Sequence, residues 1–213
     1  MYALASAACP IALWVGNLST AAHYTGMLVD SSRKHDLPLW SAYGSRFQQA
    51  IVLMGGDIVV GAQLLDTSLD EVAQFDLGFR STLMAEALGQ AGRIAEGLAL
   101  VEAGIEQFEV NCYTPELVRL KDELSLLHGR PGAAGSTEIH FRQALDGARE
   151  HGALSWELRA ATSLARLLRN QGRPADATAC LQPIYDRFTE GFSTADLIAA
   201  KQLLDDLGPA GHR

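Results

Sequence analysis

The sequence has few cysteines, and none of them are spaced like a metal site or a redox pair. Cys9, Cys112 and Cys180 are the only three in 213 residues, and no C-x-x-C occurs. Disulfide-built secreted domains and structural zinc sites need more thiols at closer spacing. Cys112 has no Lys, Arg or His beside it to lower its pKa, so a redox role is not favoured. We therefore expect a reduced, cytoplasmic setting.

Positive charge is also scarce. The chain has 17 Lys and Arg against 25 Asp and Glu, a net charge of -8, which opposes binding to nucleic acid because such affinity depends on neutralising phosphates. No charged side chain precedes Asp30. This apolar start lacks the basic residues of a signal peptide, and Pro10 and Asn17 interrupt any membrane-spanning stretch. We expect a buried helix there and no membrane insertion.

Sequence motifs for catalysis are missing as well. "GQAGRIAEG" lacks the Lys-Ser/Thr of a nucleotide-binding phosphate loop, and there is no HExxH. His140 and His151, with Glu138 and Glu150 nearby, could form a metal-binding surface, but ordinary surface histidines are the preferred interpretation. The sequence therefore predicts no enzyme activity, no metal and no cofactor.

A short pattern is present several times: a glycine and a polar residue, then a small residue five positions after the glycine. It occurs as "GNLSTA", "GDIVVG", "GRIAEG" and "GRPADA", with a degenerate copy at "GRPGAAG". The glycines are Gly16, Gly56, Gly92, Gly129 and Gly172. A glycine can adopt the left-handed backbone that ends a helix, and the small residue allows two helices to approach closely. Each copy is therefore predicted to join two helices by a tight turn.

Apolar residues flank these glycines at the period of an α-helix. Leu158, Ala161, Leu164, Ala165 and Leu168 precede Gly172, and Ala177, Cys180, Leu181, Ile184, Tyr185 and Phe188 follow it. We expect Pro183 to bend the second of these helices. Thr114 before Pro115 is predicted to be an N-cap, and Ser193 with Asp196 a capping box.

The predicted fold is all-α: about eleven helices in antiparallel pairs, stacked as a superhelical array in one domain. The units would span residues 1–36, 37–72, 73–112, 113–152 and 153–192, and a capping helix 193–208.

The glycine turns and the unit length resemble a divergent tetratricopeptide array. "LSWELRAATSLARLLRNQGRPADATACLQPIYDRFTEGFSTADLIAAKQLLDDL" resembles, in particular, the C-terminal tail of large bacterial multidomain signalling ATPases. Those proteins join a winged-helix regulator or a nucleotide cyclase to a central ATPase. The resemblance implies a non-enzymatic sensor or protein-interaction module that acts on attached signalling or transcription domains. The ATPase and effector parts themselves are absent from this sequence.

In tetratricopeptide arrays the first helix of each unit lines a concave groove, which implies a set of partner-binding residues here. They are Arg159, Thr162, Arg166, Arg169 and Asn170, then Arg119, Glu116 and Glu123, then Glu86 and Gln90, then Tyr43 and Arg46. The sensor module would bind a protein partner here; the alternative function is a free-standing scaffold that binds an acidic peptide or a small anionic effector in this Arg-lined groove. The alternative is a solvated face whose charges, such as Glu157 and Arg159, pair with neighbouring units.

The uncharged N-terminal edge supports a separate expectation. Residues 2–30 are expected either to pack on a preceding domain of a longer chain or to form the interface of a homodimer.

Overall fold

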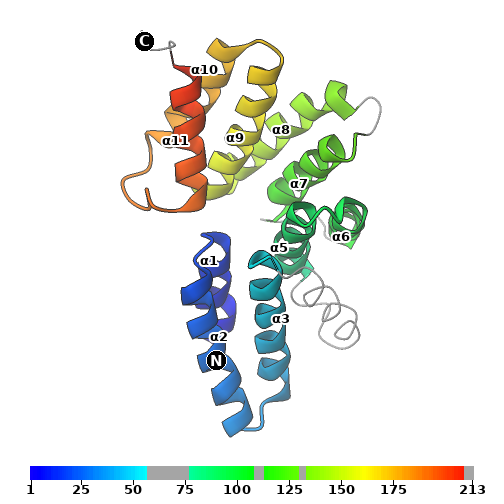
Figure 1. Cartoon of the computed structure of the whole chain (residues 1–213), viewed down its shortest axis with the longest axis vertical. Helices are drawn as coiled ribbons and strands as arrows, with labels where there is room; N and C mark the ends of the chain where they lie inside the picture. The colour runs from blue at the N-terminus through cyan, green and yellow to red at the C-terminus, as the bar shows by residue number, and fades with distance from the viewer. Residues whose placement is uncertain (57–76, 108–112, 130–132, 209–213) are drawn as a thin grey trace. The chain divides into compact units, whose positions relative to one another are not determined.

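The structure, a computed structural model, describes residues 1–56, 77–107, 113–129 and 133–208 (Figure 1). Within these ranges every regular element is a helix, so the all-α prediction is confirmed. The chain divides into two compact units, Met1–Leu100 and Val101–Arg213.

In the N-terminal unit, consecutive helices pack against each other. A short π-helix, η1 (Leu4–Ala8), continues into α1 (Cys9–Trp14) and is followed by α2 (Leu18–Lys34) and α3 (Pro38–Met54). After the residues that are not described come α5 (Leu77–Gln90) and α6 (Ile94–Gln107), which begins in this unit. Helix α1 packs on α2, and both contact α3. The core contains Leu13, Leu28, Phe47 and Leu83, all nearly inaccessible to solvent.

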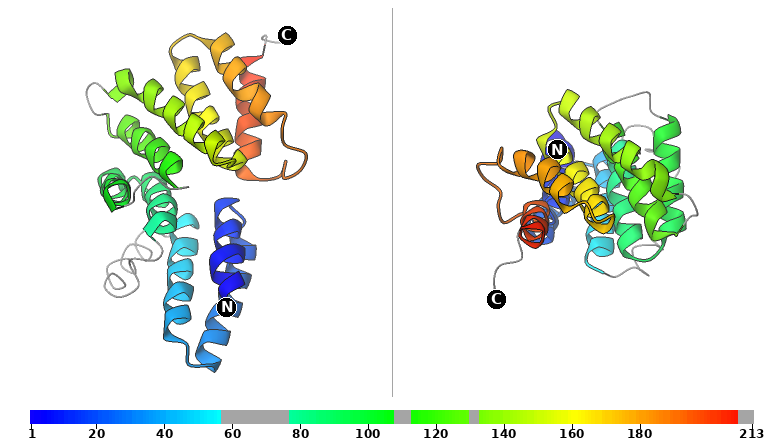
Figure 2. Two further views of the ribbon diagram at one scale, coloured as in Figure 1. Left: turned by 180° about the vertical axis from the view of Figure 1, so that it is seen from behind. Right: turned by 90° about the horizontal axis from the view of Figure 1, so that it is seen from above.

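The described part of the C-terminal unit holds the remaining helices (Figures 1 and 2). They are α7 (Thr114–Leu127), α8 (Ala133–Glu150), α9 (Leu154–Asn170), α10 (Pro174–Tyr185) and α11 (Ala195–Leu207). Each helix packs against the next, and α9 also contacts α7 and α11. Helix α9 is therefore the central helix of this unit.

The turn glycines adopt the backbone that the repeated pattern predicted. Gly16, Gly56, Gly92, Gly129 and Gly172 all have positive φ, between 68° and 91°. At Gly172 the turn closes through hydrogen bonds from Gly172 N to Arg169 O and from Arg173 N to Leu168 O. This satisfies carbonyls that the end of α9 would otherwise leave unpaired.

The apolar stripes around Gly172 are confirmed as core. Leu158, Ala161, Leu164, Ala165 and Leu168 of α9 are each at most 1% exposed. From α10, Ala177, Leu181 and Ile184 join them. Cys180 and Tyr185 of α10 pack at the edge, as does Phe188, which lies beyond the end of the helix. Helix α11 covers the same core with Leu197, Ala200 and Leu204, and exposes Lys201, Asp205 and Asp206 as expected of a closing helix.

Two predicted caps are wrong. Thr114 is the first residue of α7 rather than its N-cap, which is Tyr113. The N-cap of α11 is Thr194, without a side-chain hydrogen bond, so Ser193 and Asp196 form no capping box. Asp196 pairs with Arg159 of α9 instead. The predicted position of Pro183 inside a helix is confirmed, and α10 ends two residues beyond it.

Candidate functional site

A buried carboxylate, Glu116, lies in the first turn of α7. Its residue is 1% exposed, yet the side chain is ionised, because two arginines hold it. Arg119, one turn later, donates from Nε to Oε2 at 2.9 Å and from Nη2 to Oε1 at 2.7 Å. Arg159 of α9 places Nη1 2.8 Å from the same Oε1. A bidentate pair and a second guanidinium together supply the compensation that a buried carboxylate needs.

Arg159 is shared between two neighbouring helices. Its Nη1 contacts Glu116 of α7, and its Nε lies 3.6 Å from Oδ1 of Asp196 in α11. The side chain of Arg159 is only 10% exposed. Glu116 of α7, Arg159 of α9 and Asp196 of α11 therefore form a series of negative, positive and negative charge. We call Glu116, Arg119, Arg159 and Asp196 the interior ion cluster.

The electrostatics of Glu116 follow from this arrangement. Burial alone would raise the pKa of its carboxyl, but the charges of Arg119 and Arg159, with the hydrogen bond from Arg119, outweigh burial and lower the pKa. Arg119 also contacts Ser163 at 3.3 Å, and Ser163 donates to Glu123. The cluster thus continues along the interface between α7 and α9.

A second interior carboxylate, Glu157, lies in the first turn of α9. Its side chain is 2% exposed and pairs with Arg149, at the end of α8, at 3.1 Å and with Arg187, beyond α10, at 2.6 Å. Glu157 and Arg159 are two positions apart, so they face different sides of α9. Helix α9 therefore carries a buried carboxylate, Glu157, that pairs with α8 and the segment after α10, and a largely buried guanidinium, Arg159, that pairs with α7 and α11.

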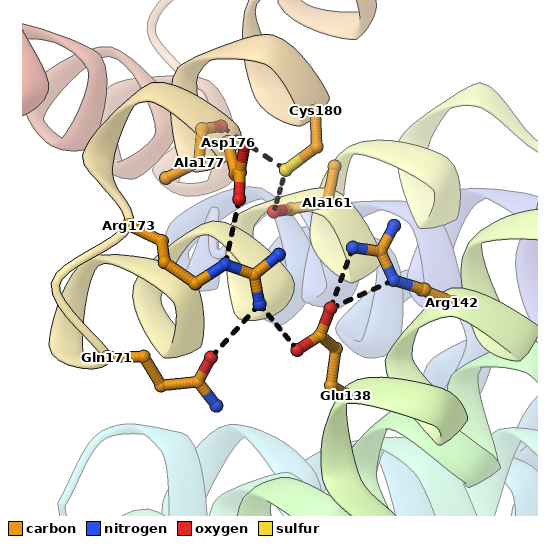
Figure 3. A network of polar contacts seen from close by, with 8 residues as sticks. All are labelled: Glu138, Arg142, Ala161, Gln171, Arg173, Asp176, Ala177 and Cys180. Atoms are coloured by element: carbon orange, nitrogen blue, oxygen red, sulfur yellow. Dashed lines mark hydrogen bonds and ion pairs between the residues drawn. The ribbon is translucent and has the colours of Figure 1, made fainter.

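A third group of polar contacts joins α8 to the turn between α9 and α10 (Figure 3). Glu138 accepts from Arg142 at 2.8 Å and from Arg173 at 2.9 Å, and Arg173 also pairs with Asp176 at 2.7 Å. The Cys180 thiol donates to the carbonyl of Ala177 at 3.2 Å. Burial, above all, raises the pKa of Cys180 to about 11, so the thiol stays protonated and is a poor nucleophile at neutral pH.

The predicted groove residues of the C-terminal unit divide into paired and exposed side chains. Arg119 and Arg159 are in the interior ion cluster, and Thr162 is buried with its hydroxyl donating to Leu158 O. Arg169 lies 3.7 Å from Asp206. Arg166 and Asn170 are exposed, and no acidic side chain in the described part of this unit pairs with Arg166.

The remaining predicted residues belong to the N-terminal unit. Arg46 of α3 is buried, and Tyr43 is half-buried between the rings of Trp40 and Phe47. Glu86 of α5 is half-buried and Gln90 is exposed. The structure therefore brings together the groove residues of α7 and α9, and the others lie in a separate unit.

His140 has a specific bond that its sequence neighbours did not indicate. Its Nδ1 lies 2.8 Å from Oδ2 of Asp122, which links α8 to α7. The side chain of Asp122 is 10% exposed. Burial raises the pKa of its carboxyl by more than His140 and Lys121 lower it. Cys112, the other residue considered for chemistry, lies outside the described residues.

The pairing of Glu116 with Arg159 was not predicted specifically, but the sequence carries a signal for it. Glu116 precedes Gly129 by 13 residues, and Arg159 precedes Gly172 by the same 13 residues. Opposite charges at matched distances from the turn glycines occupy equivalent places on successive first helices. Aligning the units on their glycines therefore finds the pair.

The described residues contain neither a metal-binding cluster nor a membrane-spanning helix. No group of three or more His, Cys, Asp or Glu side chains there could hold a metal ion. None of the helices described has the length and apolarity to cross a bilayer.

Comparison of the chain with protein-family models, curated proteins and solved structures found no significant match.

Proposed function

We propose that this chain is a tetratricopeptide-like helical-repeat module that binds a protein partner and carries no catalytic activity. One observation carries the proposal: Arg159 of α9 bonds to Glu116 of α7 and lies near Asp196 of α11. One helix from each successive pair is thereby held against the next, which is the arrangement that gives repeat arrays a shared inner face.

The exposed end of this face is the proposed contact surface. Arg159 and Arg119 are neutralised inside the chain, while Arg166 and Asn170, farther along α9, reach solvent. A polar surface with one unpaired guanidinium suits hydrogen bonding to a protein or peptide. It carries too little positive charge for a strongly anion-selective groove, so a protein partner is preferred over a small anionic effector.

The broader role follows the sequence resemblance. A partner bound along α9 would bias contacts among α7, α9 and α11, and a change in those contacts could be transmitted to attached signalling domains. On this proposal, the chain is the regulatory part of a bacterial signalling ATPase or transcriptional regulator.

Site-specific crosslinking tests the surface. A photoreactive amino acid at Asn170 should trap a defined protein in native cells, and the same group at Ala179, exposed on α10, should not. Arg166→Glu, added to the Asn170 probe, should abolish the crosslink while circular dichroism shows an unchanged helical fold. Equal crosslinking from both positions, or none from Asn170, would reject this surface.

A further inference from the structure

The first 29 residues include no Lys, Arg, Asp or Glu side chain. The structure nevertheless exposes large apolar side chains here: Tyr2, Ile11, Val15 and Met27 are four of the nine such residues found exposed among those described. About a seventh of the chain thus holds almost half of the exposed large apolar side chains among the described residues.

Helix α1 is apolar on both of its faces. Cys9, Ala12 and Leu13 face the core and are at most 4% exposed. Ile11 and Val15 lie four positions apart, on one face, and are 54% and 36% exposed. A helix that is hydrophobic on all sides is normally buried on all sides. The face of α1 that contains Ile11 and Val15, which we call the outer α1 face, therefore lacks a covering element within the described N-terminal unit.

The charge of the chain favours a second copy as the covering element. Two molecules with a net charge of -8 repel each other, and contact through surfaces rich in acidic side chains would add to that repulsion. A twofold interface places the same patch of both copies in contact. Two copies of an uncharged patch can pack together without like-charge repulsion. Two copies of a charged patch can do so only if its positive and negative side chains are placed to pair with each other across the interface.

A membrane surface is a poorer candidate. Helices that lie on membranes carry Lys and Arg that attract the anionic lipid headgroups. Helix α1 has none, and α2 has its only two, Arg33 and Lys34, in its last turn.

We propose that the chain self-associates through the outer α1 face, with Ile11 and Val15 of two copies packed against each other. The proposal is independent of the partner surface on α9. Because the interface is apolar and the chains repel, added salt should strengthen the association by screening that repulsion. An interface held by ion pairs would weaken in salt.

Sedimentation equilibrium over a broad concentration range tests the proposal. The wild-type chain should dimerise, and Ile11→Glu/Val15→Glu should weaken dimerisation by more than about a hundredfold, because four carboxylates would be buried together. The matched control is Leu127→Glu/Ile139→Glu, which changes two apolar side chains of the C-terminal unit that are more exposed than Ile11 and Val15, and it should dimerise like wild type.

Misfolding is controlled by a milder variant, Ile11→Ser/Val15→Thr, which should weaken dimerisation to a smaller degree. A wild-type chain that stays monomeric at the highest concentration would overturn the proposal. Equal loss of dimer in the Leu127/Ile139 control, or association that weakens in salt, would also overturn it. The same holds if the chain stays monomeric and binds only a different protein or lipid vesicles through the outer α1 face.

Discussion

The N-terminal and C-terminal units contain similar helix hairpins, each around an apolar core, but they differ in the further interactions that join their helices. In the N-terminal unit, rings of Tyr2, Trp40, Tyr43 and Phe47 follow one another, with centroids 5.8 to 6.5 Å apart. In the C-terminal unit, Glu116 and Glu157 are buried and each is held by two arginines. Apolar packing is almost indifferent to salt and pH, whereas buried ion pairs depend on protonation. The two units should therefore respond differently to the same conditions.

The largest effect is expected from Glu116→Gln. The amide keeps the shape of the side chain but leaves the guanidinium groups of Arg119 and Arg159 without their buried counter-charge, which should cost about 3–5 kcal/mol of unfolding free energy. Urea denaturation followed by Trp fluorescence measures the loss. Glu96→Gln removes an exposed carboxylate paired with Arg93 and is the matched control, with an expected cost below about 1 kcal/mol. Similar losses in both variants would show that burial of Glu116 does not increase the cost of removing its charge.

A comparable perturbation of the N-terminal unit is Leu28→Ala. Leu28 is fully buried, so the cavity and lost transfer free energy should cost about 2–5 kcal/mol. Unlike the loss in Glu116→Gln, this loss should be the same at low and at high salt, as measured by urea denaturation in each. A strong salt dependence for Leu28→Ala would contradict the contrast between the units.

Acid should destabilise the C-terminal unit first. The pKa of Glu116 is lower in the folded chain than its usual 4.5, so the folded state binds fewer protons. The stability from Glu116 is complete above that value and is lost as the pH falls through the lowered folded pKa. NMR spectra recorded from neutral to acidic pH should lose the amide signals of α7 and α9 before those of α2 and α3. In Glu116→Gln the C-terminal unit is less stable from the start, but its stability should fall less steeply as the pH is lowered, because the titrating group with the lowered pKa is gone.

The smallest effect is expected at Asp122. Its pKa is raised, chiefly by burial, so the ionised carboxylate is less favourable in the folded chain than in the unfolded one. Asp122→Asn keeps an acceptor for His140 and should change stability at neutral pH by no more than about 1 kcal/mol, in the stabilising direction. Thermal unfolding at neutral pH checks it. A large loss would show that His140 and Asp122 act as a strong ion pair like those at Glu116.

The sequence predicted well those features that depend on nearby residues. The turn at Gly172 needs only a residue that accepts positive φ, and the stripe from Leu158 to Leu168 needs only the helical period. The ion pairs depend on how far neighbouring helices rotate about their axes. Arg159 was expected to face a groove, and its contacts with Glu116 and Asp196 instead match the alternative of charges paired with neighbouring units.

Asp196 illustrates the same limit at a helix end. Its distance from Ser193 fits a capping box, but the carboxylate turns toward Arg159 of another helix. The local rule does not hold here, because the charge of a largely buried guanidinium attracts the carboxylate more strongly than a backbone amide at an exposed helix end.

The alternation of charge across Glu116, Arg159 and Asp196 also limits how such a chain can grow during evolution. Tandem duplication of the single hairpin α9–α10 would set one copy of Arg159 beside another, each with only one of its two acidic partners. Duplicating two hairpins together would preserve the order of signs. An array of such hairpins therefore keeps its charge order only when it is lengthened by two hairpins at a time.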